Sequence, residues 1–185
     1  MNNIEIVEEI TDGKVFLRKI SEEDAKFLYK SLKKEVTKHL SINPLSSIEY
    51  SKKLIKRYEK YWDKKLQFNY VIELRQNNNK EKDVKKLGSI SIWNLSWRHF
   101  RGEIGIWLNS RYWKQGYAKR ALNLIKLIAL HHLNLNRIEA HIAVKNKRSI
   151  NLFIKCGFSQ EGRLKSYLYL DGEFQDAVLL SLLRN

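Results

Sequence analysis

The apolar residues of this 185-residue chain recur with two periods, one typical of β-strands and the other of amphipathic α-helices. Runs rich in β-branched and aromatic residues predict seven strands, several of them bounded by polar turns. The clearest turn is Asp171-Gly172, a hairpin signal between the last two strands. The predicted strands cover residues 15–17, 68–74, 87–95, 103–108, 137–144, a stretch from 158, and 177–183.

Two helices are predicted in the first third of the chain, each preceded by residues that can cap it. Ser21 and Asp24 fit a capping box, and apolar residues then repeat at helical spacing as far as Val36. Ser46 or Ser47 caps the second helix, which carries a row of lysines four residues apart. This row is either a solvated face or a contact with an acidic partner. Its members are Lys52, Lys56, Lys60 and Lys64.

Two further helices are predicted between the later strands, a long one over 117–133 and a short one over 149–155. The resulting order, β-α-α-β-β-β-α-β-α-β-β, is not a regular βα alternation and disfavours a doubly wound nucleotide-binding fold. We therefore expect an α/β protein of the α+β type, a single domain over residues 1–185. Its central twisted, mixed sheet would have about seven strands flanked by about four helices. Residues 76–86 are expected to form a mobile loop within a hairpin.

Composition excludes several classes of protein. A single Cys rules out a disulfide framework and any Cys-based zinc site. No run approaches the roughly 18 to 20 apolar residues that span a bilayer, and the first ten residues lack a signal-peptide core. A cytoplasmic protein without membrane attachment is therefore expected. His131 and His132 are adjacent on a predicted helix and cannot share a face, so no metal site is expected.

The chain has 35 Lys and Arg but only 20 Asp and Glu, which gives a net charge of +15. This excess of positive charge points to an anionic partner. One anion site can be placed at the start of the long helix. The turn containing Gly116 and Ala118 lets the backbone approach a ligand, and the first N–H groups of a helix attract anions. Lys114, Lys119 and Arg120 add positive charge nearby. The turn is neither a P-loop nor a dinucleotide-binding loop.

Two spaced motifs in this half of the chain resemble those of the GNAT acetyltransferases, most closely the RimJ/RimL-like branch of N-terminal protein acetyltransferases. Residues 113–118, Trp-Lys-Gln-Gly-Tyr-Ala, are similar to the family pattern Gln/Arg-x-x-Gly-x-Gly/Ala, with Trp in the first place. Residues 146–150 and 155–162 resemble its Asn-x-x-Ser … Lys-x-Gly-Phe-x-x-Glu-Gly block. The resemblance covers nearly the whole chain, since residues 17–25 and 169–176 also look like this branch.

The resemblance implies the GNAT fold and transfer of an acetyl group from acetyl-CoA to a primary amine, by direct attack on the thioester and without a metal. Backbone amides of the first motif would hold the coenzyme A pyrophosphate. Backbone groups of strand 103–108 and the Asn146 side chain would bind the pantetheine arm, although Asn146 also fits a simple turn. The implied cofactor-binding residues are Ile106, Leu108, Trp113, Lys114, Gln115, Gly116, Tyr117, Ala118, Lys119, Asn146 and Ser149.

The resemblance also assigns catalytic roles. Glu103 is the expected general base, acting through water; its alternative is a surface residue on an edge strand. Ser149 is expected to protonate the leaving thiolate, because Phe153 stands where many members have Tyr; its alternative is a helix N-cap. Some RimL-like enzymes carry a carboxylate where this chain has Leu168. Trp93, Trp107 and Tyr167 are expected to wall the acceptor pocket.

The expected activity is acetylation of a protein N-terminus, such as that of a ribosomal protein, by a monomer or homodimer. Deprotonation at pH 7 costs roughly 1 kcal/mol for an α-amine and about 4.6 kcal/mol for a lysine, which favours an α-amine or a well-desolvated site. A small-amine acetyltransferase (polyamine, aminoglycoside or amino acid) is one alternative, although a basic surface repels polyamines. A non-catalytic RNA- or ribosome-binding module is the other, and it would not need Gly116, Ala118, Glu103 and Asn146 together.

Overall fold

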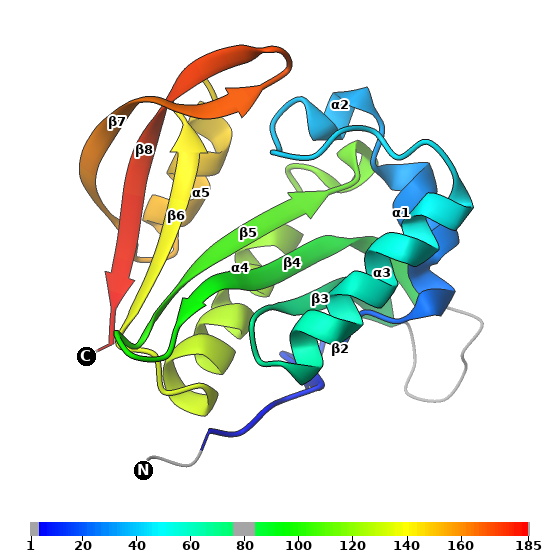
Figure 1. The fold of residues 1–185 in the computed structure, drawn as a ribbon. Helices are drawn as coiled ribbons and strands as arrows, with labels where there is room; N and C mark the ends of the chain where they lie inside the picture. Colours follow the sequence, from blue (N-terminus) through cyan, green and yellow to red (C-terminus); the bar gives the residue numbers. More distant parts are fainter. Residues whose placement is uncertain (1–3, 76–83, 185) are drawn as a thin grey trace.

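One eight-stranded mixed sheet organises the computed structural model, which describes residues 4–75 and 84–184 (Figure 1). The strand order is β1-β2-β3-β4-β5-β6-β8-β7. Neighbouring strands pair antiparallel except for β5 and β6, which pair parallel. The strands are β1 (Glu9–Thr11), β2 (Val15–Lys19), β3 (Phe68–Arg75), β4 (Val84–Ser96), β5 (Arg101–Leu108), β6 (Arg137–Ala143), β7 (Ser159–Leu170) and β8 (Glu173–Leu183).

Helices cover both faces of this sheet, with α3 in front of it and α4 behind it in Figure 1. The larger apolar core lies between the sheet and α4, and a smaller one lies under α1 and α3. In the described part of the chain, none of the helices is long and apolar enough to cross a membrane. The helices are η1 (Glu22–Asp24), α1 (Ala25–Ser31), α2 (Lys34–Thr37), α3 (Ile48–Asp63), η3 (Ser110–Tyr112), α4 (Tyr117–Leu127), the π-helical η4 (Ile128–His132) and α5 (Lys147–Lys155).

The sheet and its class confirm the predicted α/β fold, with differences at element ends. The eighth strand, β1, was not predicted because only three residues pair at the edge of the sheet. The first predicted helix stops at Ser31 and resumes as α2, and the long one becomes a π-helix after Leu127. Of the predicted loop over 76–86, residues 84–86 belong to β4, whereas 76–83 lie outside the described residues.

The parallel contact between β5 and β6 is short. Only three residue pairs form, and the last joins Glu103 to Glu139. Beyond it β5 continues to Leu108 and β6 to Ala143, but the two strands diverge (Figure 1). The β6-side edge of β5 after Glu103 therefore has backbone donors and acceptors without a strand partner, and these need water or a ligand.

Strand alternation assigns the two faces of β5 to different tasks. Ile104, Ile106 and Leu108 pack into the core beneath α4. The intervening residues face α1 and α3, where Trp107 stacks on Phe27 with ring centroids 5.9 Å apart. Glu103 is two positions from Gly105 and four from Trp107, so it lies on this second face.

A buried ionic cluster anchors the start of the α1 region to the sheet. Asp24 is fully buried and Glu73 is 2% exposed, and Arg18 bridges them with Nη2 2.9 Å from Asp24 Oδ1 and 2.8 Å from Glu73 Oε1. The predicted capping box is confirmed, since the Ser21 N–H donates to Asp24 Oδ2 at 2.9 Å. Burial would raise the pKa of Asp24, but hydrogen bonds from Arg18, Lys86 and Ser21 outweigh burial and lower it.

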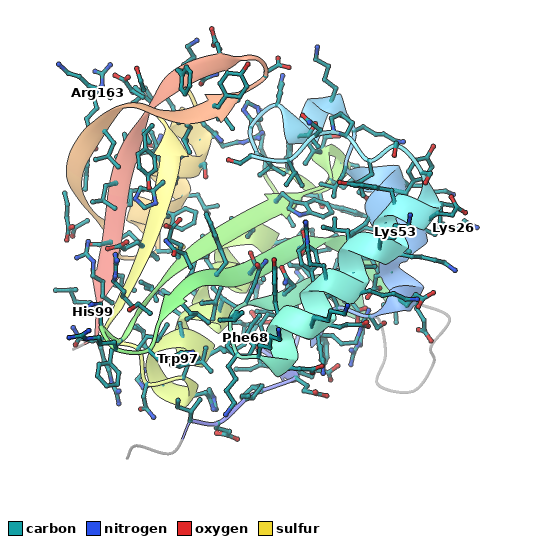
Figure 2. All side chains as sticks on the ribbon, viewed as in Figure 1. Lys26, Lys53, Phe68, Trp97, His99 and Arg163 are labelled. Carbon is teal, nitrogen blue, oxygen red and sulfur yellow. The ribbon has the colours of Figure 1, made fainter. Side chains whose placement is uncertain are left out.

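Removal of the cluster's guanidinium should cost much more stability than removal of an exposed one. Arg18→Leu removes the cation shared by two buried carboxylates and leaves Asp24 with Lys86 and Glu73 with Arg75. Its free energy of unfolding at pH 7 should fall by about 3 kcal/mol. Arg163 (Figure 2) forms an exposed ion pair with Asp176, and Arg163→Leu should cost only a small part of that free energy because water screens the pair. Urea denaturation measures both values.

The same comparison has a pH dependence with a defined sign. Because the folded-state pKa of Asp24 is lowered, its stabilising contribution is present above its ordinary pKa of about 3.9 and is lost as pH falls. The deficit of Arg18→Leu should therefore shrink below about pH 4. Equal losses for the two variants at pH 7, or a deficit that grows with acid, would contradict the role of the cluster.

Candidate active site

A cavity of about 1010 Å³ lies where β5 and β6 diverge and extends beneath α1 and α3. The residues expected to act in catalysis, cofactor binding or the acceptor pocket all line it except Gln115, whose Nε2 donates to the Arg111 carbonyl at 2.7 Å. Their roles stay predictions, but the fold brings them to one place. The expected residues in its lining are Trp93, Glu103, Ile106, Trp107, Leu108, Trp113, Lys114, Gly116, Tyr117, Ala118, Lys119, Asn146, Ser149 and Tyr167.

The turn before α4 opens a helix N-terminus toward this cavity. Gly116 is the N-cap residue and has φ +81°, and Lys114 has φ +61°. A Cβ built on Gly116 would meet no atom within 4 Å, so glycine is required here by backbone conformation rather than by space. The first N–H groups of α4 have no earlier carbonyl in the helix to pair with, and they suit an anion.

Basic side chains near this turn divide into available and occupied groups. Lys114 and Lys119 line the cavity, whereas Arg120 lies outside its lining and pairs with Asp12, with Nη1 2.7 Å from Oδ2. The Arg148 guanidinium lies over the Trp113 ring, 3.6 Å from its centroid. This stacking places a further cation at the cavity wall.

The Trp at the first motif position has a structural task. Trp113 Nε1 donates to the Leu108 carbonyl at 2.8 Å, which joins the turn to the end of β5. The backbone carbonyl of Leu108, expected to meet the pantetheine arm, is thus already engaged in one hydrogen bond. Both Ile106 and Leu108 direct their side chains into the core beneath α4.

Glu103 is buried inside the sheet, so the alternative of a surface residue on an edge strand is wrong. It is 5% exposed, and β5 has neighbours on both sides. Asn94 Nδ2 donates to its Oε1 at 2.8 Å, and Oε2 lies 3.1 Å from His141 Nδ1. Burial would raise the pKa of Glu103, but the His141 contact and the Asn94 hydrogen bond lower it. The carboxylate is therefore ionised at neutral pH.

His141 is the site residue that sequence reasoning missed. It lies on β6 in the cavity wall, with Nδ1 sealed from solvent close to Glu103 but not aligned with it as a hydrogen bond. Its ring centroid is 4.7 Å from that of Tyr167 on β7. A lone histidine in a strand carries no motif, so no signal in the sequence pointed to it.

Glu139 completes an acidic pair with Glu103 across the β5–β6 junction. Ligand atoms of Glu103, Glu139 and His141 all lie within 4.8 Å of one another, a spacing that would suit a divalent metal. Glu139, however, contacts two guanidinium groups, with its Oε1 2.5 Å from Arg137 Nε and its Oε2 3.6 Å from Arg101 Nη1. The cluster's charge is thus balanced by arginine, and the expectation of no metal stays a prediction.

The second motif lies at the opposite wall of the cavity, at the start of α5. Asn146 is the N-cap residue, and its Oδ1 accepts from the Ser149 N–H at 3.2 Å. The N-cap alternative for Ser149 is therefore wrong. The Nδ2 of Asn146 has no hydrogen-bond partner among the described residues, so it can meet a ligand while Oδ1 caps. Phe153 is 2% exposed and packs edge-on against Phe158.

The part of the cavity beneath α1 and α3 is apolar with a few polar groups. Asn69 is buried, and its Nδ2 lacks a hydrogen-bond partner among the described residues. Trp93, on the neighbouring strand β4, is 43% exposed. Glu103 is the sole carboxylate among the described lining residues. The Lys and Arg residues in the same lining are Arg57, Lys114, Lys119, Arg148 and Lys155.

Comparison with known proteins identifies relatives over nearly the full chain. An uncharacterized N-acetyltransferase, YoaA, of Bacillus subtilis is 28% identical over 173 residues, covering 92% of this chain and 94% of YoaA. The [ribosomal protein uS5]-alanine N-acetyltransferase of Escherichia coli is 43% identical over 49 residues, 26% of this chain and 25% of that enzyme.

A solved structure shows the same fold. The crystal structure of spermidine N-acetyltransferase from Vibrio cholerae in complex with CoA and spermine matches with a TM-score of 0.80 and 22% identity, covering 94% of this chain and 97% of that one. Residues 14–159 match the protein family described as "Acetyltransferase (GNAT) domain". The chain therefore belongs to the GNAT family of N-acetyltransferases, enzymes that use acetyl-CoA as the acetyl donor.

Proposed function

We propose that this acetyltransferase acts on the α-amine of a protein N-terminus, such as that of a ribosomal protein, in the manner of the RimJ/RimL-like branch. One observation carries the proposal: Glu103 is the sole carboxylate among the described lining residues, beside five Lys and Arg. An α-ammonium brings one positive charge, which one carboxylate can balance. A polyamine brings several, and each additional charge would lie near cations without a counter-ion.

The lining residues suggest how each substrate is held. The N-terminus of α4, with Lys114 and Lys119, suits the phosphates of acetyl-CoA, and Asn146 Nδ2 suits an amide carbonyl of the pantetheine arm. The unpaired edge of β5 would bind the rest of that arm. At the thioester, the amine nitrogen attacks the carbonyl carbon as the thiolate leaves, and the Ser149 hydroxyl is proposed to protonate it.

The amine must lose a proton before it attacks. For an α-amine with a pKa of about 8, this costs roughly 1 kcal/mol at pH 7, against about 4.6 kcal/mol for a lysine side chain. A buried carboxylate beside the amine draws the ammonium form into the site and favours the transfer of its proton. Glu103 is proposed to supply that negative charge.

A polyamine is the second candidate acceptor, because the solved spermidine N-acetyltransferase of Vibrio cholerae binds CoA and spermine on the same fold. The cation at Arg57 in the cavity beneath α3 argues against it.

The non-catalytic alternative has no support from the relatives, which are named as N-acetyltransferases. For the lysine row, Lys52 and Lys56 already approach Glu22, at 3.3 and 3.9 Å, so any acidic or ribosomal partner would meet a partly neutralised edge.

Introducing a side chain at the α4 turn should prevent binding of acetyl-CoA. In Gly116→Glu the added carboxylate would project into the open space before the helix N-terminus and repel the phosphates. We expect acetyl-CoA affinity, measured by calorimetry, to fall about 100-fold. Gly172→Glu is the matched control, because Gly172 has φ +87° and no atom within 4 Å of a built Cβ but lies outside the cavity lining. Equal losses in both variants would contradict the assignment.

The choice of acceptor can be measured by release of free CoA. A tetrapeptide amide with uncharged side chains and a free N-terminus should give a kcat/KM at least about 10-fold above that of spermidine at equal ionic strength. Arg57→Gln should raise kcat/KM for spermidine more than for the peptide, because it removes a cation from the cavity. A preference for spermidine in the unmodified protein would refute the N-terminal assignment and leave the acetyltransferase activity intact.

A further inference from the structure

The Glu103–His141 pair has the arrangement of a carboxylate that orients an imidazole toward a cavity. Glu103 lies 3.1 Å from Nδ1, the ring nitrogen that is sealed from solvent. His141 also lines the cavity, which leaves Nε2 as the nitrogen on the cavity side. Stacking against Tyr167 holds the face of the ring. Such pairs are often poorly aligned without substrate and tighten when the complex forms.

Glu103 is poorly suited to take the proton itself. Both of its oxygens have partners, Asn94 on Oε1 and His141 beside Oε2, and it is almost completely buried. Its pKa lies below the ordinary value for a glutamate, so its carboxylate is a weak acceptor for a proton from an α-ammonium of pKa about 8. An ordinary imidazole is a much stronger base than a carboxylate and is therefore a far better proton acceptor.

We propose that His141 is a catalytic residue, the base that accepts the proton of the acceptor amine at Nε2, and that Glu103 acts through it as a positioning residue. This rests on the proposed function only in needing an amine acceptor at this wall of the cavity. One proton of the ammonium passes to Nε2, and the free amine then forms the C–N bond as the C–S bond breaks. The second amine proton goes to the leaving thiolate, and His141 returns its proton to solvent.

Charged and titratable groups lie around His141 on β5, β6 and β7. Carboxylates face it from β5 (Glu103) and β6 (Glu139). Arg101 on β5 and Arg137 on β6 pair with Glu139 and offset its negative charge. From β7 the ring of Tyr167 covers it, and on β8 the residue paired with it is the uncharged Leu179.

The test is the pH dependence of kcat in three variants, with saturating acetyl-CoA and an acceptor that the unmodified protein acetylates. His141→Gln should lower kcat about 100-fold or more and abolish the acid limb of the profile. Glu103→Gln should keep an acid limb but move it to lower pH, because the charge that stabilises the imidazolium is gone. His99→Gln, an exposed histidine at the far end of the sheet (Figure 2), should change neither.

A second measurement separates chemistry from folding. His141→Ala should bind acetyl-CoA as tightly as the unmodified protein by calorimetry, and added imidazole should restore part of its kcat. An unchanged acid limb in His141→Gln, or no rescue of a folded His141→Ala that binds acetyl-CoA, would overturn the proposal. The assays are run with both the peptide and spermidine. If the proposed acceptor is wrong, the unmodified protein itself will fail to acetylate the peptide, whereas a wrong base shows only in the His141 variants.

Discussion

The short parallel contact between β5 and β6 is the constraint from which the site follows. Hydrogen-bonded pairing holds the two strands together only as far as Glu103 and Glu139, and the strands then separate. A sheet interior cannot leave backbone polar groups unpaired without water or a ligand to meet them. The opening is kept by elements on either side of it: the Trp113 indole ties the α4 turn to Leu108, and α5 packs against α4 and β8. The cavity thus lies where the sheet would otherwise have continued.

Acidic and basic side chains lie in different parts of the structure around that opening. The acidic groups lie where β5 and β6 still pair, buried in the strands and in contact with Asn94, His141, Arg101 and Arg137. Most of the cations in the cavity lining lie at the α4 turn and on α5, among them Arg148. The cavity lining is therefore basic near α4 and α5, whereas its one carboxylate among the described residues, Glu103, lies on β5.

Local patterns predicted much of this protein, and non-local pairing accounts for what they missed. The motif before α4 could be recognised because a helix start, its turn and its cations are neighbours in sequence, and Gly116 has the positive φ that such a turn needs. Glu103 could be singled out only by resemblance, since its burial depends on a parallel neighbour 36 residues away in the chain. His141 and Tyr167 come from two further strands, and which residues face each other there is set by register. No periodicity within one segment contains that information.

Gly116 separates two properties of glycine that are usually confounded, its small size and its lack of handedness. Because a Cβ at this position would meet open space, volume is not what restricts it. The restriction is chirality: L-residues rarely adopt φ near +81°, whereas the mirror-image D-residues adopt it readily. D-Alanine placed there by chemical synthesis would accordingly keep the fold and reduce the freedom of the unfolded chain. The genetic code offers one residue without handedness, and the turn before α4 uses it.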